Sequence, residues 1–192
     1  LVVMGDSSGQ GLTGNTNVAI GVTAGNNSTG DLNTWLGYSA GLQANGSKNI
    51  AAGYAALAIS TGSENIGFGT WAGRNSNGSF NVSNGAYAGA YTSGSRNVAN
   101  GNQAGIGLAG DNNISMGVGS STGTTTTDGV NFSKNGGATS TTVTQTTASN
   151  TVALGSMALV GANNAVAVGA SSNAAAANAI AVGTGAKVGS SA

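Results

Sequence analysis

Glycine returns every 16 residues in the first part of the chain, and this period constrains the fold more than any other feature. The first glycine column holds Gly5, Gly21, Gly37, Gly53, Gly69, Gly85, Gly101 and Gly117. A second column runs from Gly14 to Gly110 and an asparagine column from Asn17 to Asn113, both with the same spacing. Columns that keep one register over eight units predict stacked supersecondary units, each too small to fold alone.

Each unit carries the pattern of one short strand followed by turns. The segment Asn17-Val18-Ala19-Ile20-Gly21 is typical, and alternation along a strand places Val18 and Ile20 on the same face. The first of these two positions is mostly β-branched, as strands prefer. The second glycine is followed by Asn, Asp or Ser, which favours a turn. A 16-residue coil has room for two short strands and two turns, so the prediction is an all-β parallel β-roll, or β-solenoid.

The 16-residue register stops near Ser121, and a related register of 14 residues begins near Asn150. Gly155, Gly169 and Gly183 carry the new period, and each follows a short apolar run. Residues 122–149 are rich in threonine and match no column. We therefore expect one continuous β-roll with three parts: 16-residue repeats over 1–121, an insertion over 122–149 and 14-residue repeats over 150–192. The insertion is expected to be a protruding hairpin or strand excursion, with a disordered loop as the alternative.

Composition excludes most kinds of chemistry. The 192 residues include no histidine and no cysteine, which removes the usual metal ligands, Ser–His pairs and Cys nucleophiles. Five basic residues are too few for a nucleic-acid footprint, and no apolar run is long enough to span a membrane. The segment 105–110 spells G-x-G-x-x-G, but the repeat columns explain its outer glycines. We expect a non-enzymatic chain with no catalytic, metal or cofactor-binding residues and no nucleic-acid partner.

The larger apolar residues recur on one face of one strand in each coil. A thin coil cannot enclose them, and a soluble monomer avoids so long an exposed apolar stripe. Identical repeats in register could cover it in a parallel homotrimer with cyclic symmetry. The candidates for this trimer core are Val18, Ile20, Ile50, Ile66, Phe68, Val82, Asn84, Val98, Asn100, Ile114, Val152, Leu154, Val166, Val168, Ile180 and Val182.

Two members of this set are polar. Asn84 and Asn100 stand where other coils have Ile20, Phe68 or Met116. If the face points to the trimer axis, these amides form polar layers that fix the register between chains, as single polar layers do in coiled coils. The alternative is that this column is solvated.

Aromatic residues are scarce, which makes their placement informative. Trp71 and Tyr87 occupy one column on consecutive coils, so we expect them to lie side by side and outward. Together with Arg74, Tyr91 and Arg96 they form a candidate ligand patch, because Trp, Tyr and Arg dominate binding energies at interfaces. The alternative is packing between chains of the trimer. Trp35 lies in a column of small residues, which indicates a local exchange of packing volume.

The pattern Asn-x-apolar-Ala-apolar-Gly, with a small residue three places later, resembles the head domain of YadA-like trimeric autotransporter adhesins. The resemblance covers the chain outside 122–149 and is close over Asn150–Ala186. It implies a left-handed parallel β-roll that is homotrimeric and displayed on the bacterial cell surface. The anchor would be an outer-membrane region absent from this sequence, so the fragment itself is not membrane-inserted. The implied partners are matrix proteins of the collagen, fibronectin or laminin type, or a host cell surface. The alternative function is a structural segment of a trimeric fibre, of phage or pilus type, with its binding tip elsewhere.

Overall fold

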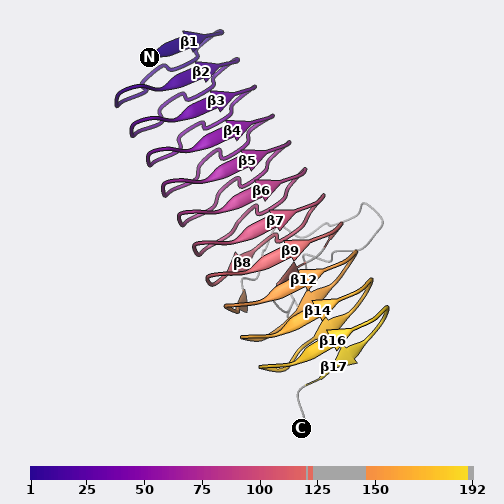
Figure 1. Ribbon diagram of the computed structural model, residues 1–192. Helices are drawn as coiled ribbons and strands as arrows, with labels where there is room; N and C mark the ends of the chain where they lie inside the picture. Colours follow the sequence, from indigo (N-terminus) through magenta and orange to yellow (C-terminus); the bar gives the residue numbers. More distant parts are fainter. Residues whose placement is uncertain (120, 123–145, 190–192) are drawn as a thin grey trace.

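The computed structural model describes residues 1–119, 121–122 and 146–189, and this part of the chain is an elongated stack of β-coils (Figure 1). The main sheet has eleven strands and runs the length of the stack. Its strands are β1 (Val2–Met4), β2 (Val18–Ile20), β3 (Thr34–Leu36), β4 (Ile50–Ala52), β5 (Ile66–Phe68), β6 (Val82–Asn84), β7 (Val98–Asn100), β9 (Ile114–Met116), β12 (Val152–Leu154), β14 (Val166–Val168) and β16 (Ile180–Val182). The described residues contain no helix, and hence none that could cross a membrane.

Strand register follows the sequence period. Val18 pairs in parallel with Thr34 in the next coil, and Thr34 pairs with Ile50. After the change of period, Val152 pairs with Val166. The predicted parallel β-solenoid with coils of 16 and then 14 residues is therefore confirmed.

The interior is lined by small side chains. The middle residue of each strand points inward, as the fully buried Ala19 and Ala51 do, and the alanine three places after the first glycine is buried opposite it. Trp35 is the exception, since it fills the interior and is also fully buried. A Cβ atom on Gly25 or Gly41 would lie 2.6 or 2.2 Å from its ring, so these two glycines make the room. The expected local exchange of packing volume is thus confirmed.

The other side of the 16-residue coils differs from the expectation of two strands per coil. It holds single-residue parallel bridges, such as Thr29↔Asn45 and Asn45↔Thr61, rather than a second regular strand. The cause is local: Thr23, Gly25 and Asn27 all have φ between 53° and 60°, so the backbone turns repeatedly instead of extending. A two-residue strand, β8 (Leu108–Ala109), appears only in the last of these coils. The 14-residue coils do have a second sheet, made of β10 (Ser121–Thr122), β13 (Leu159–Val160), β15 (Asn173–Ala174) and β17 (Lys187–Val188).

The coil between β9 and β12 joins the two coil types. Its first half supplies β10, which pairs with β13 of the 14-residue coils. Its second half supplies β11 (Thr146–Thr147), which pairs with β8 of the 16-residue coils. Both ends of the predicted insertion 122–149 are thus part of the solenoid, and the Ala148 N–H donates to the Ala109 carbonyl at 2.8 Å. The predicted hairpin or loop lies in 123–145, outside the described residues.

A buried ladder of asparagine side chains joins consecutive 16-residue coils. Asn65 is representative: its Nδ2 donates to the Gly78 carbonyl at 2.9 Å and its Oδ1 accepts from the Asn81 N–H at 2.9 Å. The same pair of bonds recurs from Asn17 to Asn97. The asparagine column thus satisfies backbone groups where the coil turns into its strand.

The asparagines of the 14-residue coils occupy a different position. Asn150, Asn164 and Asn178 have φ of 55–61°, and their exposed amides bond to one another along the stack. Thr151 takes the buried place next to Asn113, whose Oδ1 accepts from the Thr151 hydroxyl at 2.7 Å. Asn113 lies four residues before Gly117, whereas Asn150 lies five residues before Gly155. This one-residue shift marks the end of the buried ladder.

Close approach of successive coils explains the glycine columns. At Gly53 the φ of 136° lies in a region that L side chains rarely adopt. A Cβ atom there would also lie 2.5 Å from the carbonyl oxygen of Gly69 in the next coil. Glycine is required at this place for both reasons.

Candidate assembly and binding surfaces

The first and third residues of each main-sheet strand point away from the coil interior and form what we call the strand face. All the predicted trimer-core candidates lie on it, and none of them is buried within a single chain. Ile50 is 39% exposed and Phe68 is 43% exposed. No strand contributes a charged residue at these positions. The solenoid therefore presents a long uncharged apolar surface that its own fold does not cover.

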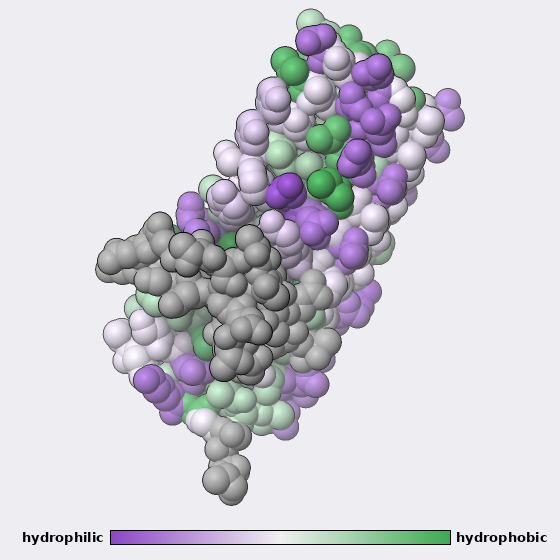
Figure 2. Space-filling model, turned by 180° about the vertical axis from the view of Figure 1, so that it is seen from behind, coloured by the Kyte–Doolittle hydropathy of each residue, from purple (hydrophilic) through white to green (hydrophobic). Residues whose placement is uncertain are grey.

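Other faces of the solenoid are more polar. On the side turned away from the view of Figure 1, hydrophilic residues are interspersed with hydrophobic ones along the stack (Figure 2). The ion pair between Lys48 and Glu64, 3.2 Å apart, is exposed and belongs to a turn column rather than to the strand face. Charge is thus placed away from the strand face.

Asn84 and Asn100 interrupt the strand face. They are neighbours in register on β6 and β7, with Phe68 before them and Met116 after them in the same column. Both side chains are exposed, and neither amide bonds to another part of the described chain. The structure thus places two amides free to face a partner on an otherwise apolar surface.

The predicted aromatic pair is present on a corner of the solenoid. The rings of Trp71 and Tyr87 lie 5.2 Å apart, centroid to centroid, at an interplanar angle of 44°. The Arg74 guanidinium lies 4.3 Å from the Trp71 ring centroid, and its Nη1 is 3.5 Å from the Tyr91 hydroxyl. Four of the five predicted patch residues are therefore brought together.

Sequence reasoning missed a second aromatic pair beside the first. Tyr38 and Tyr54 stack with centroids 5.1 Å apart and rings only 4° from parallel, and about half of each side chain is exposed. The Trp71 N–H donates to the Tyr54 carbonyl at 2.8 Å, so the two pairs occupy consecutive coils. We call Tyr38, Tyr54, Trp71 and Tyr87 the aromatic ladder. The available signal was the column directly after the first glycine, which holds both Tyr38 and Tyr54.

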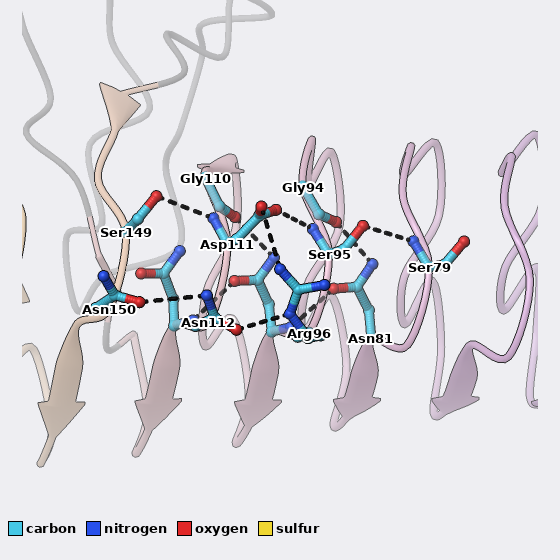
Figure 3. A network of polar contacts seen from close by, with 12 residues as sticks. Ser79, Asn81, Gly94, Ser95, Arg96, Gly110, Asp111, Asn112, Ser149 and Asn150 are labelled. Atoms are coloured by element: carbon cyan, nitrogen blue, oxygen red, sulfur yellow. Dashed lines mark hydrogen bonds and ion pairs between the residues drawn. The ribbon is translucent and has the colours of Figure 1, made fainter.

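Arg96 belongs to a different network from the other predicted patch residues (Figure 3). Its Nε donates to Asn112 Oδ1 at 2.8 Å and its Nη2 lies 3.5 Å from Asp111 Oδ2. Asp111 Oδ1 also accepts from the Ser95 N–H at 2.7 Å. Arg96 therefore bonds to Asn112 and Asp111 in the turn beside the buried asparagine ladder.

The Ser95–Asp111 bond is one rung of a second polar ladder, which follows the second glycine column. In it, each side chain accepts from the backbone N–H one coil earlier: Ser95 Oγ accepts from the Ser79 N–H, and Ser149 Oγ from the Asp111 N–H (Figure 3). This ladder crosses the junction between the two coil types without a break, as Ser149 N–H donates in turn to Asn163 Oδ1. The side-chain oxygens of this ladder are thus bonded to backbone N–H groups of the adjacent coil.

The strand face carries apolar and amide side chains, and the aromatic ladder carries rings beside Arg74. Within residues 1–119, 121–122 and 146–189, no three His, Cys, Asp or Glu side chains gather closely enough to hold a metal ion. Comparison of the sequence with protein-family models and with curated proteins finds no match. The strand face and the aromatic ladder are the candidate functional surfaces of the described chain.

Proposed function

We propose that this chain is the head segment of a trimeric bacterial surface adhesin of the YadA-like kind, which attaches its cell to host cells or to extracellular-matrix proteins without catalysis. The observation that carries the proposal is the strand face: an uncharged apolar surface that runs along the main sheet and is uncovered in one chain. Monomeric soluble proteins rarely expose such a surface.

A parallel trimer would cover the strand face of every chain. Each coil contributes one strand to the main sheet, and these strands pair in register from coil to coil. Three identical chains aligned in parallel would therefore place the same residues of each chain next to one another along the whole stack. A cyclic assembly closes on itself and leaves no strand face exposed. Three copies of each outer corner then face solvent, and weak contacts with a surface can add through effective concentration. Attachment to the outer membrane through a further C-terminal region belongs to the same proposal.

Molar mass measured by light scattering tests the assembly. We expect three chains for the unmodified protein and dissociation for Ile66→Asp, which places a charge on the strand face. Leu32→Asp is the matched control, because Leu32 is 52% exposed in a turn column and its φ of 60° is acceptable for aspartate. A stable unmodified monomer would contradict the trimer.

Solid-phase binding to collagen, fibronectin and laminin, and to host cells, tests adhesion. Saturable binding of the trimer to at least one of these surfaces is the expected result. A trimer that binds none of them would instead favour a structural fibre segment whose binding tip lies elsewhere.

A further inference from the structure

The aromatic ladder is the surface feature that assembly through the strand face leaves unexplained. Its four rings come from consecutive coils. They belong to three of the four tyrosines and to one of the two tryptophans in the sequence. Coils lie about 4.8 Å apart, so the ladder extends for about 14 Å along the solenoid. The rings are partly exposed, and they contact one another in two pairs, Tyr38 with Tyr54 and Trp71 with Tyr87.

From this arrangement we infer that the aromatic ladder binds a linear polysaccharide whose sugars carry carboxylates. The inference deepens the proposed adhesin function by naming the class of ligand at one surface. Within each pair the ring centroids lie 5.1–5.2 Å apart, near the spacing of the coils. Rings repeated at this step along the stack match a polymer of sugar rings, because the C–H face of a sugar packs against the exposed part of an aromatic face. Tyr and Trp supply such a platform at low cost in conformational entropy, having only two side-chain torsions each.

The column that holds Trp71 and Tyr87 does not call for large side chains. Trp71, Tyr87 and Tyr91 all have φ near 60°, the left-handed region that disfavours bulky side chains. Other coils have Ser7, Thr23 or Gln103 in the column of Trp71 and Tyr87. The rings of Trp71 and Tyr87 therefore add surface that the fold itself does not require.

Arg74 supplies the charge preference. The ion pairs within the described residues join Lys48 to Glu64 and Arg96 to Asp111, so Arg74 faces no carboxylate there. Stacking on Trp71 fixes the guanidinium plane. Nη1 lies 3.5 Å from the Tyr91 hydroxyl, so the edge formed by Nε and Nη2 is the one that can donate to a ligand. A sugar carboxylate seated beside Trp71 would accept a paired, charge-assisted hydrogen bond from that edge.

The surroundings favour a glycan over a protein partner. Thr70 and Asn75 are exposed beside the rings and can bond to sugar hydroxyl groups. A protein hot spot is normally ringed by residues that exclude water, whereas these neighbours are exposed polar groups. Polar groups interleaved with aromatic faces match the alternating hydroxyl and C–H surfaces of a sugar.

The two tryptophans provide the assay. Trp71 is partly exposed and Trp35 is fully buried, so ligand at the ladder should shift the emission of Trp71 and protect it from iodide quenching. The probes are hyaluronan oligosaccharides, which carry a carboxylate in every disaccharide, and neutral chitin oligosaccharides of equal length. We expect saturable binding of hyaluronan to the unmodified protein. Isothermal titration calorimetry, which does not depend on Trp71 fluorescence, should show this binding weakened at least tenfold by Trp71→Ala and by Tyr54→Ala.

Two further variants separate the parts of the inference. Arg74→Gln should weaken hyaluronan binding about tenfold and leave chitin binding unchanged. Phe80→Ala is the control, since Phe80 is 53% exposed in a different turn column, and it should bind as the unmodified protein does. Equal affinity for both polymers would overturn the preference for acidic sugars.

Failure of the inference is distinct from failure of the adhesin function. If neither polymer binds, or if Trp71→Ala binds hyaluronan unchanged, the glycan site is wrong even where attachment to cells or matrix proteins persists. If Trp71→Ala and Tyr54→Ala instead lower the molar mass of the assembly, the rings pack between chains and the site is likewise refuted.

Discussion

Truncation of one asparagine in the buried ladder should destabilise the solenoid far more than its single side chain suggests. Asn65→Ala removes the acceptor for the buried Asn81 N–H and the donor for the partly buried Gly78 carbonyl, each now bonded at 2.9 Å. A buried polar group left without a partner costs about 1–3 kcal/mol, and the partly buried one falls at the low end of that range. We expect a loss of about 2–4 kcal/mol in the free energy of unfolding.

Equilibrium urea unfolding at a fixed protein concentration measures this loss, because the concentration affects the apparent stability of an oligomer. Asn102→Ala is the matched control: it deletes the same side chain at an exposed turn position where the amide makes no bond to the described chain. Its effect should lie within about 0.5 kcal/mol of zero. If Asn65→Ala and Asn102→Ala unfold at the same urea concentration, the ladder does not stabilise the coils and the reasoning is refuted.

Three further changes probe the backbone and the strand face. Gly53→Ala should cost more than about 3 kcal/mol, through overpacking and unfavourable φ together, whereas Gly185→Ala, with nothing within 4 Å of the new Cβ, should cost only about 1 kcal/mol in the same urea assay. Ile59→Asn should raise the thermal midpoint, gaining about 1 kcal/mol, because Ile59 is a β-branched residue at φ 58° and asparagine tolerates that region; an unchanged midpoint would contradict this. The double change Asn84→Ile with Asn100→Ile should give a more stable assembly with less uniform alignment of chains, seen by cross-linking, and a less stable but equally aligned assembly would exclude a role in register.

The sequence predicted the features that follow from period and alternation. The strand at Val18–Ile20, the inward Ala19 and the parallel register all follow from a side-chain period of two within a coil period of 16. The buried place of Trp35 was also predictable, because its column neighbours are small. These features depend on patterns that recur in every coil, so an atypical residue in one coil does not change the prediction.

Other features depend on turn geometry, which the type of a single residue does not predict. Nothing in the residue type of Trp71 or Ile59 indicates a left-handed backbone, since that conformation belongs to the column and not to the side chain. Arg96 was grouped with Trp71 by repeat position, but it lies in the turn next to the asparagine ladder and bonds to Asp111. Tyr54 was missed because it lies one column away from Trp71. Comparing residues only within one column does not reveal neighbours in the adjacent column.

The direction of the hydrogen bonds between coils has a mechanical consequence. They run along the length of the stack, and the two ends of the described chain lie at its opposite ends (Figure 1). A pulling force applied to those ends should therefore peel off the outermost coils first, because an end coil is bonded to a neighbour on one side only, and coils should detach one at a time. Each 16-residue coil would then release about 50 Å of chain while giving up only one layer of the stack. Under load, such a protein would lengthen in small steps, one coil at a time, while the remaining coils stay stacked.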